Sequence, residues 1–63
     1  MTLEVIKRAA FEVLTGRETA HSLKVLREAQ TGWEQVRDSD PETYHLVKRA
    51  MIERMKRQIR RAA

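Results

Sequence analysis

The residues with the most chemistry to offer are the arginines and lysines near the C-terminus. Residues 45–61 hold seven of the thirteen basic residues of this 63-residue chain and only one acid, Glu53. Guanidinium groups bind phosphates and carboxylates through paired hydrogen bonds, so this composition favours an anionic partner. The candidate contacts to a nucleic-acid phosphate backbone are Arg49, Arg54, Lys56, Arg57, Arg60 and Arg61.

The charge is distributed unevenly along the chain. Residues 41–63 carry seven basic and two acidic residues, a net charge of +5, whereas residues 1–40 carry six basic and seven acidic residues, a net charge of −1. Such asymmetry is typical of chains that bind an anionic partner. Two alternatives to nucleic acid stay open. The partner could be an acidic protein surface, or the cations could form a solvated face, paired with Glu53 and stabilised by the helix dipole.

Residue patterns that carry catalysis or bind metals are sparse. The chain has no cysteine, and its two histidines, His21 and His45, stand far apart. It contains neither an HExxH motif nor a glycine-rich phosphate loop, and no serine or cysteine nucleophile with a nearby base is recognisable. The sequence therefore predicts a protein that is not an enzyme and that uses no metal or cofactor.

Three helices are predicted to carry these residues, over about 2–15, 18–37 and 41–61. Gly16 is a natural stop for the first helix, and Asp40 followed by Pro41 is typical of an N-cap and a first helical residue. Gly32 interrupts the second segment, but the apolar positions continue in phase beyond it. We therefore expect one helix there, straight or bent at Gly32, and a break at this glycine is the alternative that the sequence leaves open.

These helices predict an all-α fold in a single domain over residues 1–63. The two longer helices are similar in length and joined by a short loop, which favours an antiparallel hairpin with the shorter N-terminal helix packed across it. A chain of this length buries only about 60% of the surface that its unfolded form exposes. Because no disulfide adds stability, we expect a small bundle completed by homodimerisation.

The helix over 41–61 is predicted to be amphipathic. At about 100° per residue, its apolar side chains cover an arc of roughly 140°, and most of its basic side chains lie across the opposite arc. Lys48 falls on the apolar side, whereas Leu46 and Ala50 fall among the polar positions. The apolar arc consists of Tyr44, Val47, Met51, Ile52, Met55, Ile59 and Ala62. Four of them, Val47, Met51, Met55 and Ile59, are expected to build the core or a dimer seam.

Four apolar residues are candidates for contact with a partner or a second subunit, namely Phe11, Met51, Met55 and Ile59. Phe11 falls on the polar side of the first helix, so either that helix is covered on two sides or Phe11 contacts a partner. Trp33 and Tyr44 are expected to pack near each other where the second and third helices join.

The sequence favours a small binding protein that contacts DNA or RNA, mainly at phosphates, through the helix over 41–61. The alternative is a regulatory protein-binder, an inhibitor or adaptor, that docks on a larger protein through the same helix or through the exposed side of the first helix. No apolar stretch nears the roughly 18 residues of a membrane span, and there is no cysteine. We therefore expect no membrane association and a cytoplasmic location.

Overall fold

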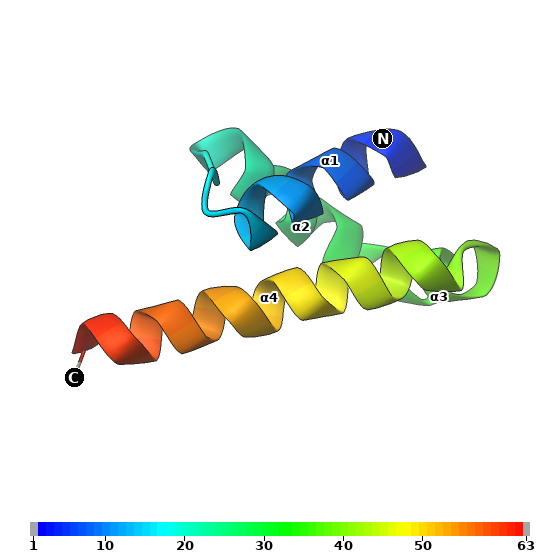
Figure 1. Cartoon of the computed structure of the whole chain (residues 1–63). Helices are drawn as coiled ribbons and strands as arrows, with labels where there is room; N and C mark the ends of the chain where they lie inside the picture. Colours follow the sequence, from blue (N-terminus) through cyan, green and yellow to red (C-terminus); the bar gives the residue numbers. More distant parts are fainter. Residues whose placement is uncertain (1, 63) are drawn as a thin grey trace.

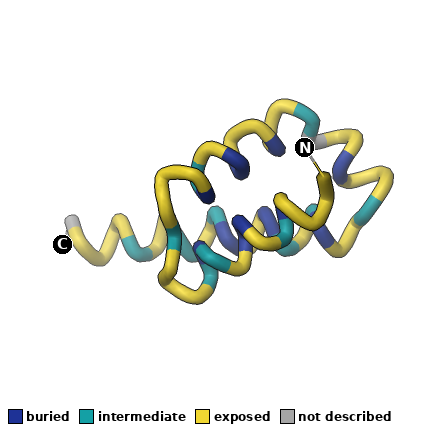
Figure 2. The backbone as a smooth tube through the Cα atoms, turned by 90° about the horizontal axis from the view of Figure 1, so that it is seen from above, coloured by how far each residue is buried: buried dark blue, intermediate teal, exposed yellow. Residues whose placement is uncertain are grey.

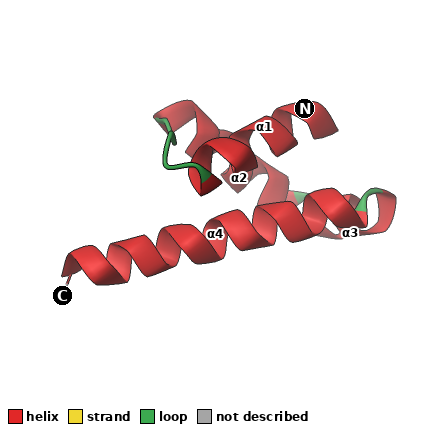
Figure 3. Cartoon of the chain, in the orientation of Figure 1, coloured by secondary structure: helices red, strands yellow, loops and turns green. Residues whose placement is uncertain are grey.

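The computed structural model describes the backbone of residues 2–62 and the side chains in that range except those of Trp33 and Ala62. Helices and short connections make up this part of the chain, and it contains no strand (Figure 3). The helices are α1 (Leu3–Leu14), α2 (Ala20–Thr31), α3 (Trp33–Ser39) and α4 (Pro41–Ala62). The all-α fold class is confirmed, whereas the described residues form four helices rather than the three predicted.

Threonine hydroxyls begin the first two helices. The Thr2 hydroxyl accepts a hydrogen bond from the N–H of Val5 at 3.3 Å. The Thr19 hydroxyl accepts from the N–H of Ser22 at 3.1 Å, and the Ser22 hydroxyl accepts in return from the N–H of Thr19 at 3.3 Å. These bonds satisfy N–H groups that a helix leaves without a partner at its N-terminus. The Ser22 hydroxyl also donates to Oε1 of Glu12 at 2.8 Å, which ties α2 to α1.

α1 ends at a glycine turn, as predicted. The N–H of Gly16 donates to the carbonyl of Val13 at 3.2 Å, and the N–H of Arg17 donates to the carbonyl of Glu12 at 2.7 Å. This pair of bonds is the Schellman arrangement, which needs one residue in the left-handed conformation. Gly16 is that residue, with a φ of 78°.

Gly16→Ala is expected to lower the free energy of unfolding by about 1–2 kcal/mol, because a side chain disfavours the left-handed backbone. Space is not the reason, since nothing lies within 4 Å of the Cβ position. Gly32→Ala is the matched control: Gly32 has a φ of −107° and equally open surroundings, so its effect should be neutral or stabilising by up to about 1 kcal/mol. Urea unfolding measures both, and equal losses at the two glycines would contradict the left-handed turn.

α2 ends at Gly32, so the predicted single helix across that residue is wrong. The N–H of Gly32 bonds to the carbonyl of Ala29, three residues back, which tightens the last turn. The carbonyl of Gly32 then accepts from the N–H of Val36 and begins α3. The chain changes direction at this point, so α3 packs on α4 (Figure 1). Val36, which is in phase with the predicted stripe, is buried by that packing.

α4 begins as predicted, with Asp40 before it and Pro41 as its first residue. The Asp40 carboxylate accepts a hydrogen bond from the Thr43 hydroxyl at 2.7 Å, and the Lys7 ammonium lies 3.5 Å from the same oxygen. The hydrogen bonds from Thr43, and then the charge of Lys7, hold the pKa of the Asp40 carboxyl below its usual value. Lys7 thereby links α1 to the N-terminal end of α4.

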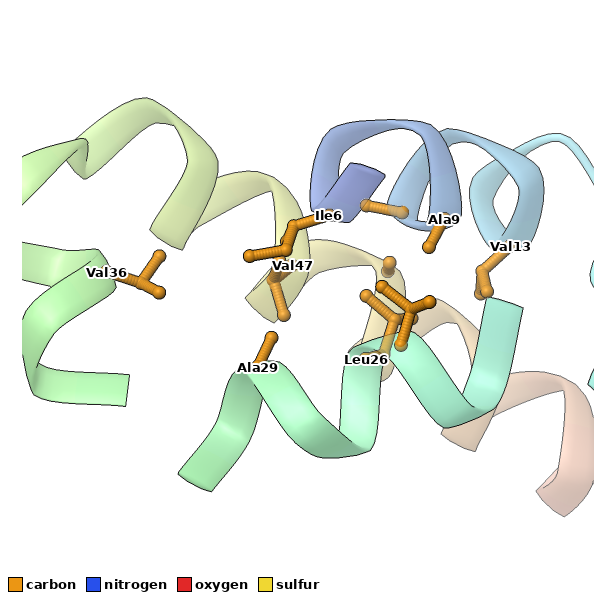
Figure 4. Packing of buried hydrophobic residues seen from close by; sticks show 10 residues of the cluster. Ile6, Ala9, Val13, Leu26, Ala29, Val36 and Val47 are labelled. Carbon is orange, nitrogen blue, oxygen red and sulfur yellow. The ribbon is translucent and has the colours of Figure 1, made fainter. Parts of the chain in front are cut away.

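α1 and α2 lie on the same side of α4, and α1 is its principal neighbour (Figure 1). The short α3, rather than a long second helix, forms the hairpin with α4, so the predicted pair of equal helices is wrong. Buried residues line the facing sides of the helices (Figures 2 and 4). The core consists of Ile6, Ala9, Ala10, Val13, Val25, Leu26, Ala29, Val36, Val47 and Ala50. Because four of these residues are alanine, the core holds few large side chains.

Candidate docking surface

The face of α4 that meets the core differs from the predicted one. Thr43, Val47 and Ala50 are each 0% exposed, and Leu46 packs against the core beside them. The sequence places Leu46 and Ala50 among the polar positions, and that prediction is wrong. The buried face lies roughly 100° around the helix axis from the centre of the predicted apolar arc. The difference arises because the neighbouring helices pack on the small residues of α4 rather than on its bulkiest ones.

Three large apolar side chains are consequently left on the outer side of α4. Ile52 is 43% exposed, Met55 57% and Ile59 67%. Their i, i+3, i+7 spacing places them in one line along the helix, here called the outer apolar stripe. Met51, another predicted contact residue, packs against the core, whereas Met55 and Ile59 do not join it. The stripe runs toward the end of α4 that projects beyond the other helices (Figures 1 and 2).

Two of the six basic residues predicted to contact nucleic acid bind the protein itself. Arg57 donates from Nη1 to the carbonyl of Val13 at 2.6 Å and from Nη2 to the carbonyl of Leu14 at 3.0 Å. α1 has no basic residue in its own last turn, so Arg57 supplies the positive charge that the helix dipole favours there. Arg54 Nε lies 3.1 Å from Glu18 Oε2, in the turn between α1 and α2. Both arginines anchor α4 to α1 and the turn after it, so neither belongs to a free cationic face.

The other four predicted basic contacts are exposed, and three of them share one side of the helix. Arg49, Lys56 and Arg60 fall within an arc of about 40° next to the outer apolar stripe, and they are here called the cationic edge. The Nζ atom of Lys56 lies 3.6 Å from Oε1 of Glu53, and this ion pair is one of the predicted pairings. An exposed pair of this kind contributes little to stability. The cationic edge can therefore exchange this contact for one with an acidic partner.

Arg61, the fourth exposed basic residue, lies on the inner side of α4. A hollow of about 350 Å³ separates this side of the helix from the turn between α1 and α2, and it is lined by Gly16, Glu18, Arg54, Arg57, Gln58 and Arg61. Two of its three arginines already bind the carboxylate of Glu18 or the end of α1. Most of the charge in the hollow is thus used to hold the fold together.

The exposed apolar residues of α1 are scattered. Phe11, the predicted contact residue on this helix, is 55% exposed, so no described element covers it. Val5 is also exposed, but it lies roughly 120° around the helix from Phe11. Scattered apolar side chains are ordinary on protein surfaces. α1 therefore offers no aligned apolar face comparable to that of α4.

The described titratable residues outside the cationic edge and the hollow beside α4 form no cluster with an evident chemical role. Among the described residues, no three His, Asp or Glu side chains are placed to hold a metal ion. His21 lines a groove of about 440 Å³ between α1 and α2, and His45 packs edge-on against the ring of Tyr44. The predicted contact of Tyr44 with Trp33 involves a side chain outside the described residues. None of the described helices combines the length and the apolar character needed to cross a membrane.

No family model, curated protein or solved structure matches this chain. A function must therefore be inferred from the outer face of α4, meaning the outer apolar stripe together with the cationic edge. The helical period of the sequence places Ile52 in the apolar arc, but Ile52 is not among the predicted contact residues. The spacing of Ile52 from Met55 and Ile59 indicates that the three side chains lie in one line. Only the burial of the opposite face of α4 shows that all three are exposed to solvent.

Proposed function

We propose that the chain is a small non-enzymatic binding protein that docks on an acidic surface of a larger protein through the outer face of α4. The observation that supports this proposal is the line of exposed apolar side chains, Ile52, Met55 and Ile59, on the side of the helix away from the core. A helix with an aligned apolar face binds by packing that face into a groove or against another helix. The expected cytoplasmic location belongs to the same proposal.

The composition of the outer face suits a protein partner better than a phosphate backbone. Protein interfaces have an apolar centre with a polar rim, and the outer apolar stripe beside the cationic edge has that arrangement. Contact with phosphates alone would leave the three apolar side chains in water. It would also lack Arg54 and Arg57, which already bind Glu18 and the end of α1. An acidic protein surface can use both parts of the outer face at once.

The combined substitution Ile52→Gln, Met55→Gln and Ile59→Gln, here called the stripe variant, tests the proposal. Glutamine is a good helix former and these side chains lie outside the core, so the variant should keep the far-UV circular dichroism of the wild type. Affinity capture from the native host, after nuclease treatment, should recover one stoichiometric partner protein with the wild type and lose it with the stripe variant.

A matched control removes three exposed apolar side chains from α1 instead, by Leu3→Gln, Val5→Gln and Phe11→Gln. This control should retain the partner. The proposal fails if the wild type captures no stoichiometric protein, or if the stripe variant retains it. Loss from the control alone would move the docking surface to the exposed side of α1.

Contact with nucleic-acid phosphates is the second candidate function, favoured by the net charge of +5 on residues 41–63. Arg49, Lys56, Arg60 and Arg61 are the exposed residues that would supply it. Four phosphate contacts give a slope of about −3.6 for the logarithm of the association constant against the logarithm of the salt concentration with duplex DNA. Fluorescence anisotropy with DNA and RNA duplexes measures binding. The double substitution Arg49→Gln and Arg60→Gln should reduce the steepness of the salt dependence with duplex DNA by about 1.8. If the wild type binds neither duplex at about 50 mM salt, contact with nucleic acid is ruled out.

The sequence predicts a homodimer with Phe11, Met51, Met55 and Ile59 as candidate contacts. A dimer joined through Met55 and Ile59 would place a second copy of the chain on the proposed docking surface. The small, alanine-rich core favours it, because pairing two copies would enlarge the buried apolar area. Sedimentation velocity of the wild type and of the stripe variant tests this occupant directly. A dimer through the stripe would be lost in the stripe variant.

A further inference from the structure

The outer apolar stripe has the spacing of a coiled-coil seam. Ile52, Met55 and Ile59 follow one another by three and then four residues, which is the a–d–a order of a heptad, and Ile at a suits a two-stranded seam. Lys48, four residues before Ile52, takes the preceding d position. Ala50 falls at f, opposite the seam, and is fully buried. The seam therefore faces directly away from the core, so a second helix can lie along it without displacing α1 or α2.

The positions that border this seam are cationic. Lys48 at d, and Arg49 and Lys56 at the two e positions, are all exposed. The g positions on the other side of the seam hold Met51 and Gln58, so no acid occupies a position that borders the seam. Glu53, at b, pairs with Lys56 from outside the border. Charges at e and g decide which helix a coiled-coil strand accepts. The border of the seam thus selects for negative charge on the second helix.

A second copy of this chain fits the seam poorly. In a parallel pair, Lys48 would face the same residue of the second copy inside the seam. In an antiparallel pair the e positions face each other, so Lys56 would meet Lys56 or Arg49 of the second copy. Like charges repel in both arrangements, and only three apolar side chains per helix are present to offset the repulsion.

We infer, building on the proposed docking function, that the occupant of the outer face is an acidic amphipathic helix of a partner protein, paired with α4 as a short coiled coil. Residues 48–59 cover about 17 Å of helix, so about three turns of the partner helix are in contact. Its apolar side chains pack on the outer apolar stripe, where the unbranched side chain of Met55 adapts to their shape. Its Asp or Glu side chains lie beside Lys48, Arg49 and Lys56.

Three synthetic helical peptides of three heptads each, titrated with the full chain, test the inference. All carry leucine at the seam positions, and their e and g positions carry Glu in the first, Gln in the second and Lys in the third. We expect the Glu peptide to bind at least about tenfold more tightly than the Gln peptide at about 0.15 M salt, and the Lys peptide not to bind. Equal affinities for the Glu and Gln peptides, or no binding of the Glu peptide, would overturn the inference.

Charge reversal gives a sharper test. Lys48→Glu with Arg49→Glu and Lys56→Glu should move the preference from the Glu peptide to the Lys peptide. A control variant makes the same change in net charge outside α4, by Arg17→Glu, Lys24→Glu and Arg27→Glu, at residues that are all exposed. The control should still prefer the Glu peptide. An equal switch in the two variants would mean attraction by net charge alone and would contradict a specific seam.

The stripe variant separates this inference from the docking proposal on which it rests. It should bind the Glu peptide at least about tenfold more weakly than the wild type does. If the stripe variant loses a captured protein but the wild type binds no peptide, docking stands and the acidic helix is wrong. If the Glu peptide binds through the stripe but the wild type captures no protein, the acidic preference stands and the docking function fails. A dimer lost in the stripe variant, or stripe-dependent binding to vesicles that contain anionic phospholipid, would assign the surface to another occupant.

Discussion

Ala50→Glu is expected to unfold the chain. Ala50 is 0% exposed and belongs to the core in the middle of α4, although the helical period of the sequence places it among the polar residues. Adding bulk to a packed core costs about 1–3 kcal/mol, and burying an unpaired carboxylate adds several more. A core in a chain of this size rarely supplies more than about 3–5 kcal/mol, so the combined cost should exceed the stability of the fold. Far-UV circular dichroism should show loss of helix without denaturant.

Met55→Glu is the matched control for this prediction, because the sequence assigns Met55 to the apolar arc that builds the core or a seam. Met55 is exposed and takes no part in the core, so the same new side chain should change the free energy of unfolding by no more than about 0.5 kcal/mol. The two substitutions therefore show which face of α4 packs against the core. If Met55→Glu unfolded the chain and Ala50→Glu did not, α4 would instead pack through its predicted apolar arc.

Arg57→Met should lower the free energy of unfolding by about 1.5–3 kcal/mol, the range for hydrogen bonds that involve a charged group. The guanidinium of Arg57 binds the carbonyls of Val13 and Leu14 at 2.6 and 3.0 Å, at the end of α1 where the helix dipole is negative. Methionine keeps the apolar stem but offers no donor to either carbonyl. Urea titration followed by circular dichroism measures the change through the unfolding midpoint.

Arg60→Met and Arg57→Lys are the controls for this effect. Arg60 is exposed on the same helix, so its loss should change stability by no more than about 0.5 kcal/mol. Lysine at position 57 keeps the charge but lacks the planar fork that reaches two carbonyls, so an intermediate loss is expected. Equal stabilities for Arg57→Met and Arg60→Met would contradict the contact between α4 and the end of α1.

Some arginines of α4 hold the fold together, whereas others are free to bind a partner. A substitution of Arg54 or Arg57 would weaken the contacts with Glu18 and α1, so a loss of binding could follow from a loss of fold. Arg49 and Arg60 bind no other described residue in this way and lie on the cationic edge. Charge substitutions at these two positions report on binding without the structural effect.

Local signals in the sequence were sufficient to predict most helix boundaries. Gly16 stops α1 because its left-handed backbone closes the last turn, and Asp40 with Pro41 begins α4 because together they end one helix and start the next. These effects act within a few residues, so they can be read from neighbouring residue types. The break at Gly32 was harder to predict, since glycine costs only about 1 kcal/mol within a helix. The packing of α3 on α4 decides between a bent helix and two helices.

The order of apolar and basic residues over 41–62 determined that α4 would be a helix with an apolar and a basic side. Only the tertiary structure decided what each side contacts. Hydrophobic periodicity gives weight to large side chains such as Ile59, yet α1 packs on α4 where small residues such as Ala50 let it fit. The use of Arg57 at the end of α1 depends on residues more than forty positions apart in the sequence. A helical period contains no information about such distant neighbours. The tertiary contacts therefore determined that an apolar stripe remains uncovered on the outer side of α4.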